Sequence, residues 1–219
     1  KELTSLPMNM LFELPELQML NVACNQKIKG DVLLDNWKKF IEGKSGKKIQ
    51  VLYLGYNNLE EMPDYEHLSQ MEKLGLIDLT NNSITEVNAF GKEINLTKVY
   101  LDYNQINKIN TTEDGYFCGY YDMESFTCTY NKLTKMPDIF NAKSKYVIGS
   151  VSFAHNEITG MQNDDNHRGV NTNNLDLSYN HLEEFPGVII KKGSPLGILI
   201  LQANGMTTIK EGDLVGPNS

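Results

Sequence analysis

One pattern recurs along the whole chain and restricts its fold more than any other feature. Residues 52–57, 99–104, 126–131 and 175–180 share the order apolar, any, apolar, any, any, asparagine, and residues 20–25, 77–82, 151–156 and 199–204 also fit it. After a first interval of 32 residues, the asparagines that end these eight blocks are 22 to 27 residues apart. Such a period is typical of repeat architectures.

Aligned on their asparagines, the eight blocks contain four columns of apolar residues. Of the 32 column positions 30 are apolar, and only Thr172 and Lys27 break the rule. Chance would give about 13, because 40% of the chain is hydrophobic. The alternation of apolar and variable positions predicts a short strand with its apolar residues on one face. One repeat cannot bury that face alone, so we expect the repeats to stack and their strands to form a parallel sheet.

An asparagine follows each predicted strand. Its side-chain amide both donates and accepts hydrogen bonds, so it can satisfy backbone groups that a tight bend would otherwise bury without partners. We therefore expect a structural ladder formed by Asn25, Asn57, Asn82, Asn104, Asn131, Asn156, Asn180 and Asn204.

The segments between the blocks differ in length and composition. Met62-Pro63, Met136-Pro137 and Phe185-Pro186 end an apolar column with proline, which favours extended or 3-10 connections over long helices. The longer first repeat has apolar residues at helical spacing, which predicts an amphipathic helix over residues 31–43 with Trp37 as a core anchor.

These features resemble the leucine-rich repeat family over essentially the whole chain. The mixture of short proline-ended repeats and one longer helical repeat is similar to surface leucine-rich repeat proteins of gut bacteria. The resemblance implies an α/β leucine-rich repeat solenoid, with a curved parallel sheet on the concave side and short 3-10, extended and helical connections on the convex side. It also implies recognition of a protein or glycan on the concave sheet, without reaction chemistry.

We expect residues 1–219 to form a single leucine-rich repeat domain of about eight repeats. Capping of the last repeat is not evident in the segment 212–219, and terminal repeats normally need caps. We therefore expect the chain to be a fragment of a longer protein, and to be monomeric or weakly associated end to end. The first residues contain no apolar signal segment, so secretion cannot be inferred from them.

The positions that point outward from the predicted sheet are the candidate binding residues. They include tyrosines with carboxylates between them, a combination that suits a protein or sugar partner. Alternatively, the tyrosines before the asparagines only pack on neighbouring repeats. The candidates on the concave face are Tyr53, Asp78, Tyr100, Asp102, Tyr103, Thr127, Tyr130 and Asp176.

Other partners and chemistries have little support. The formal charge of -8 argues against nucleic acid, and no apolar run is long enough for this segment to insert into a membrane. The four histidines and three cysteines are too dispersed to indicate a metal site, and the polar loop 163–167 lacks the pattern of a calcium loop. No nucleotide or nucleophile motif suggests a cofactor or catalysis. Cys118 is the one cysteine expected to be exposed.

The sequence therefore predicts a non-enzymatic recognition module, extracellular or anchored at a bacterial cell surface. Two alternatives stay open. The chain could be a structural spacer that displays neighbouring domains, or the specificity domain of an enzyme whose catalytic part is not in this chain.

Overall fold

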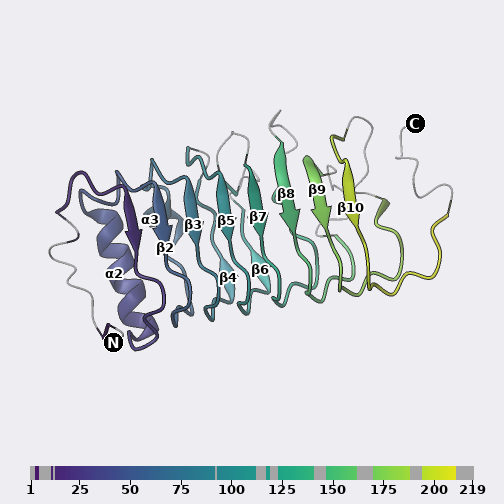
Figure 1. Cartoon of the computed structure of the whole chain (residues 1–219), viewed down its shortest axis with the longest axis horizontal. Coiled ribbons are helices and arrows are strands. Elements are labelled where there is room, and N and C mark those ends of the chain that lie inside the picture. The colour runs from purple at the N-terminus through teal and green to yellow at the C-terminus, as the bar shows by residue number, and fades with distance from the viewer. Residues whose placement is uncertain are drawn as a thin grey trace.

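The computed structural model of the chain describes residues 3–4, 11, 13–91, 93–111, 117–118, 123–140, 147–161, 170–187 and 194–210. Eight strands form one parallel sheet in which their spatial order is their order in the sequence (Figure 1). The predicted α/β solenoid of stacked repeats is therefore confirmed. The strands are β1 (Met19–Asn21), β2 (Val51–Tyr53), β3 (Leu76–Asp78), β5 (Lys98–Tyr100), β7 (Ser125–Thr127), β8 (Ile148–Ser152), β9 (Thr172–Asp176) and β10 (Ile198–Ile200).

The register of the sheet follows the apolar columns. Leu52 pairs with Leu20 on one side and with Ile77 on the other, and Ile77 pairs with Val99. Because successive strand residues point to opposite faces, the middle residue of β2, β3, β5 and β7 is buried, while its two neighbours reach the concave surface. A one-residue change of register would expose every one of these columns.

Behind the sheet, phenylalanine rings connect several coils of the core. Phe126 lies 5.7 Å from Phe153 and 5.6 Å from Phe117, measured between ring centroids, and Phe117 lies 5.9 Å from Phe90. All four residues are at most 3% exposed. The two contacts of Phe117 are edge-to-face, and contacts of this kind add to the stabilisation that burial provides.

The long first repeat contains the predicted helix, α2 (Gly30–Glu42), at the N-terminal end of the row of strands (Figure 1). It buries Leu33, Trp37, Phe40 and Ile41, which confirms Trp37 as a core residue. Gly43 follows as the C-cap, and its N–H donates to the carbonyls of the last helical turn.

Three short elements have no strong sequence signal. The helix α3 (Tyr65–Leu68) begins after Asp64, whose side chain accepts a hydrogen bond from the His67 N–H. The strands β4 (Glu86–Val87) and β6 (Lys108–Ile109) form a separate two-stranded parallel sheet on the connecting segments. Their lengths, two to four residues, are too short for a periodic pattern to indicate them.

The structure explains both exceptions in the apolar columns. Lys27 is exposed, and the adjacent Ile28 is fully buried in its place, so the first repeat is displaced by one residue after its asparagine. Thr172 is fully buried, and its hydroxyl oxygen lies 2.7 Å from the Ile148 carbonyl oxygen and 3.0 Å from that of Asn174. A hydroxyl in the core is tolerated because it is hydrogen-bonded.

The expectation for the cysteines was wrong in one respect. Cys24 is exposed, whereas Cys118 is half-buried and burial raises the pKa of its thiol to about 12. Cys128 is fully buried in the core. The polar loop 163–167 and the segment 212–219 lie outside the described residues.

Candidate functional site

The asparagines join each coil to the one before it. Asn104 Nδ2 donates to the Leu79 carbonyl of the preceding coil at 3.0 Å and to the Leu101 carbonyl of its own coil at 3.1 Å. Its Oδ1 accepts from the N–H of Ile84, also in the preceding coil, at 3.0 Å. From Asn25 to Asn180 the seven asparagines are at most 9% exposed, so their bonds are shielded from water. This ladder holds the edge of the concave sheet in a fixed geometry.

The residue before each asparagine has a left-handed backbone, with φ between 53° and 61°. We call these residues the bend column: Cys24, Tyr56, Asn81, Tyr103, Tyr130, His155, Tyr179 and Ala203. This conformation is unfavourable for residues with a side chain, especially β-branched ones, and the column contains no β-branched residue. Hydrogen bonds between coils offset the cost, since Tyr103 N–H donates to the Thr129 carbonyl at 2.9 Å and Tyr130 N–H to the Ala154 carbonyl at 3.1 Å.

Four consecutive members of the bend column stack face to face, and we call them the aromatic ladder: Tyr103, Tyr130, His155 and Tyr179. Ring centroids are 4.4, 4.1 and 4.2 Å apart along this series, with interplanar angles of 7 to 9°. The three tyrosines are nonetheless 43 to 51% exposed. The inner ring faces therefore cover one another, while ring edges and hydroxyl groups meet solvent. Sequence analysis considered the tyrosines but missed His155.

Polar groups lie at both ends of the aromatic ladder. The pKa of Tyr103 is raised by desolvation first, then by Tyr130 and by the Asp102 carboxylate, with Tyr56 adding a smaller effect. At the other end of the ladder, the Gln202 amide donates to the Tyr179 hydroxyl at 3.0 Å. The ladder is thus bordered by polar groups on both sides.

The predicted carboxylates are fixed by hydrogen bonds at the strand ends. Asp78 accepts from the N–H of Thr80 at 2.9 Å, and Asp176 accepts from the N–H of Ser178 at 2.9 Å. Asp102 instead reaches the next coil, where it accepts from the Thr127 hydroxyl at 2.6 Å and from the Thr129 N–H and hydroxyl at 2.7 Å each. All three carboxylates are half-buried and held in place before any partner arrives.

The sheet brings the remaining predicted residues into one row. Tyr53 pairs with Asp78, Asp78 with Tyr100, and Tyr100 with Thr127. Asp176 continues this row two strands beyond Thr127, after Ser152. Asp102, Tyr103 and Tyr130 lie closer to the bend. The eight predicted residues therefore lie on one face in two adjacent groups. The row on the strands contains Tyr53, Asp78, Tyr100 and Thr127, with Asp176 two strands further on, and the group at the bend contains Asp102, Tyr103 and Tyr130.

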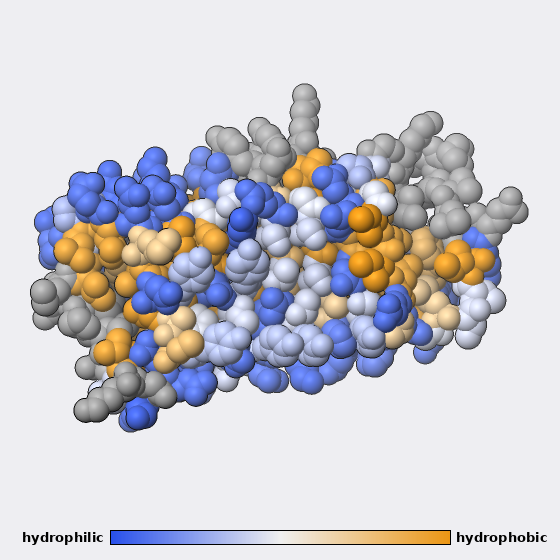
Figure 2. Space-filling view, viewed as in Figure 1, coloured by the Kyte–Doolittle hydropathy of each residue, from blue (hydrophilic) through white to orange (hydrophobic). Residues whose placement is uncertain are grey.

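The same face ends in apolar residues that sequence analysis did not single out. Ile198 and Ile200 on β10 are 53% and 40% exposed, and Met19 on β1 is 56% exposed. Figure 2 shows apolar surface over the region of β9 and β10, beside the more polar middle of the face. The concave face therefore has apolar residues at both ends and a more polar, tyrosine-rich middle.

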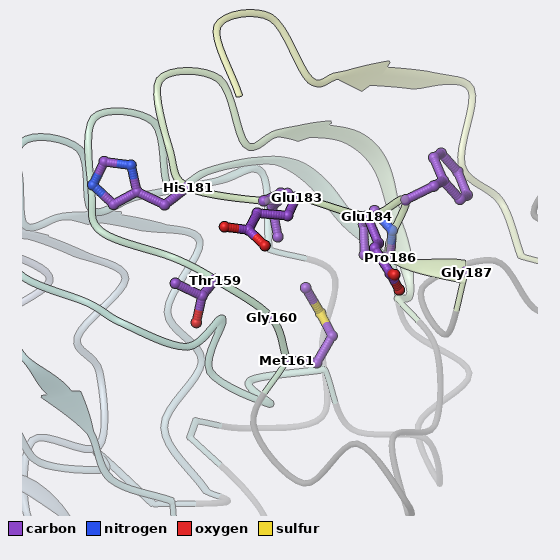
Figure 3. Close-up of a pocket in the computed structure, with 10 residues that line it drawn as sticks. Thr159, Gly160, Met161, His181, Glu183, Glu184, Pro186 and Gly187 are labelled. Carbon is purple, nitrogen blue, oxygen red and sulfur yellow. The ribbon is translucent and has the colours of Figure 1, made fainter. Parts of the chain in front are cut away.

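A hollow of about 640 Å³ lies on the connecting segments of two neighbouring coils (Figure 3). Its described lining comes from residues 159–161 and 181–187, and Glu183, His181 and Thr159 supply polar groups. Across the part of the chain that the structure describes, no three histidine, cysteine or acidic side chains are grouped to hold a metal ion. In that same part, no helix is long and apolar enough to cross a membrane.

Comparison with solved structures shows close similarity to two bacterial chains. A leucine-rich repeat protein from Bacteroides eggerthii superposes with a TM-score of 0.87 and 37% identity, and covers 99% of this chain and 36% of that one. A leucine-rich repeat protein from Bacteroides thetaiotaomicron has a TM-score of 0.87 and 41% identity, over 99% of this chain and 26% of that one.

Curated proteins are more distant. Lumican from Bos taurus is 26% identical over 189 residues, and lumican from Gallus gallus is 29% identical over 188 residues. The matched regions are 77% and 75% of this chain, so it spans about half the length of these relatives, 51% and 50%. No protein-family model matches the chain.

Proposed function

We propose that this leucine-rich repeat solenoid is a non-enzymatic recognition module that binds a protein on its concave sheet. Leucine-rich repeat folds of this kind are typically binding scaffolds without catalysis. The observation that carries the proposal is the preorganised row of Tyr53, Asp78, Tyr100 and Thr127, which four neighbouring strands hold side by side. Tyrosines often supply the dominant contacts of protein interfaces, and fixed carboxylates orient the partner.

The stacking of the aromatic ladder favours a protein over a glycan. Sugars bind aromatic side chains through exposed ring faces, whereas the inner faces of Tyr130 and His155 are covered by neighbouring rings at 4.1 to 4.4 Å. What this column offers to a partner is a series of ring edges and hydroxyl groups. These groups suit the mixed polar and apolar contacts of a protein surface.

We further propose that the module acts outside the cell, at a bacterial surface. The lumican relatives are extracellular proteins, and the two similar leucine-rich repeat structures come from the bacterium Bacteroides. The tyrosines and fixed carboxylates of the concave face favour a binding role over that of a pure spacer.

The test is an array of bacterial surface proteins, host proteins and glycans, probed with the purified chain. We expect a protein to bind, and the double variant Tyr53→Ala/Tyr100→Ala to weaken that binding by about 30-fold or more, the equivalent of ~2 kcal/mol at an interface hot spot.

The control is Tyr65→Ala, which removes an exposed tyrosine from α3, away from the concave sheet. Binding that the double variant leaves unchanged would move the site elsewhere. Absence of any binding would support the spacer, and binding to glycans alone would overturn the preference for a protein.

A further inference from the structure

The bend column contains a gap where one aromatic ring is missing. Tyr56 and Tyr103 occupy the same position in coils two and four, and Asn81 occupies it in coil three. The φ angles of these three residues are 56°, 55° and 55°. Their coils are also in register, because Tyr56 N–H donates to the Thr80 carbonyl at 2.7 Å and Asn81 N–H to the Asp102 carbonyl at 2.8 Å. Asn81 is therefore a regular step of the column without a ring.

The spacing of the aromatic ladder defines the size of this gap. Neighbouring rings in the ladder are 4.1 to 4.4 Å apart. Two such steps separate Tyr56 from Tyr103, so a flat group placed over Asn81 meets each tyrosine at ordinary stacking distance. Tyr103 is 51% exposed, whereas Tyr130, with rings on both faces, is 43% exposed, as expected for a Tyr103 ring with one face uncovered. Tyr56 is 47% exposed.

Polar groups around the gap favour a cation. Within the described residues the Asn81 side-chain amide makes no hydrogen bond, so its oxygen is available to a ligand. Asp102 lies beside Tyr103, close enough for its charge to raise the pKa of that tyrosine after the effects of desolvation and of Tyr130. Asp78 lies on the strand of the same coil as Asn81, and the whole chain carries a formal charge of -8.

We propose that the gap over Asn81, between Tyr56 and Tyr103, receives the guanidinium group of an arginine from the partner protein. A guanidinium is planar, stacks on aromatic faces and carries several N–H donors and a positive charge, which matches two ring faces, an amide oxygen and the negative charge of Asp102 beside Tyr103. Lysine has the charge without the plane, and phenylalanine has the plane without the charge. The inference rests on the proposed function, since it specifies one contact within the concave recognition surface.

The experiment uses short peptides of the form acetyl-Gly-Gly-X-Gly-Gly-amide, with X as arginine, lysine or phenylalanine, titrated into the whole chain. Binding is followed by NMR through the ring resonances of Tyr56 and Tyr103. We expect saturable shifts with arginine, and weaker binding with both other peptides. Asn81→Tyr fills the gap and should weaken arginine binding by about tenfold or more, because neither ring face stays open.

Two further variants separate the gap from general effects. Ala203→Tyr adds a tyrosine at the same backbone conformation, φ 54°, at the far end of the column, and should leave arginine binding unchanged. Asn81→Ala keeps the gap but removes the amide, and should weaken binding by a smaller factor than Asn81→Tyr. Tyrosine already occupies this conformation in four coils, so Asn81→Tyr is expected to fold, and a thermal melt checks this.

Several outcomes would overturn the inference. They are equal binding of the lysine peptide, preference for phenylalanine, no binding at millimolar peptide, or binding that Asn81→Tyr does not change. The protein identified on the array distinguishes the arginine contact from the proposed recognition function. If Tyr53→Ala/Tyr100→Ala abolishes its binding but Asn81→Tyr does not, the arginine contact fails while the recognition function stands.

Discussion

The middle of the solenoid and its C-terminal coil have the same sequence pattern but different burial. Leu175 and Leu177 in coil seven are fully buried, whereas their equivalents Leu199 and Leu201 in coil eight are only partly buried. Leu177 N–H donates to the Ile200 carbonyl, but among the described residues no acceptor faces the N–H of Leu201. An apolar column becomes core only when another coil covers it, so the stability of this protein lies mainly in the interfaces between coils.

The sharpest test of this contrast is amide hydrogen exchange. In the 219-residue chain, we expect residues 198–203 to exchange at least about 100-fold faster than residues 99–103, because local opening of the last coil breaks one interface instead of two. Mass spectrometry of peptic fragments would measure both regions in one sample. Equal protection in a monomer would contradict the view that the interfaces carry the stability.

Removing ladder asparagines should reproduce the contrast on a smaller scale. Asn104→Ala should cost about 1–3 kcal/mol, because it leaves the Ile84 N–H buried without a partner and leaves the Leu79 carbonyl with only its bond from Asn82. Asn204→Ala removes equivalent bonds at a partly buried site, where water can replace them, so we expect a cost below about 1 kcal/mol.

Urea denaturation would give both free energies of unfolding. Asn173→Ala, at an exposed position of β9, is the control and should be neutral. Identical midpoints for Asn104→Ala and Asn173→Ala would show that the asparagine bonds do not stabilise the coil interfaces.

The aromatic ladder offers a weaker version of the same test. Tyr130 stacks on rings from two neighbouring coils, while Tyr179 stacks on one. Aromatic pairs contribute about 0.5–1.5 kcal/mol each, so Tyr130→Ala should destabilise by roughly 1 kcal/mol more than Tyr179→Ala. Thermal melts of the two variants would compare them, and a larger loss at Tyr179 would mean that its bond to Gln202 outweighs ring stacking.

The smallest expected effect is a pH dependence near helix α2. His67 lies 2.8 Å from Asp64 and 3.3 Å from Glu42 on α2, and the hydrogen bond to Asp64 is the main cause that raises its pKa above 6.5. The same contact lowers the pKa of Asp64 below 3.8. The stabilisation from His67 is complete below pH 6.5 and is lost as the pH rises through the raised value. That from Asp64 is complete above pH 3.8 and is lost as the pH falls through the lowered value.

We therefore expect a slightly higher melting temperature at pH 5 than at pH 8.5, and expect His67→Gln to reduce this difference. His181→Gln, at an exposed position in coil seven, is the control for a general effect of losing a histidine. A pH dependence that His67→Gln leaves intact would assign it to other groups.

Much of this architecture could be predicted from local sequence. Two alternating apolar positions and an asparagine, repeated eight times, determine which residues face the core, and hence the strands and their register. Helix α2 was also predictable, since its apolar residues follow a helical period over thirteen residues. The sequence could equally place Tyr53 and Tyr100 on the concave side, because strand alternation alone decides that for residues between two apolar columns.

What sequence could not supply is any distance between coils. The reach of Asp102 to Thr129 in the next coil, the stacking of His155 between two tyrosines, and the displacement of Ile28 all depend on how neighbouring coils stack. The left-handed bend column and the gap at Asn81 likewise appear only in three dimensions. The physical reason is that periodicity specifies the face on which a side chain lies, whereas packing between coils sets which groups from separate repeats come within bonding or stacking distance.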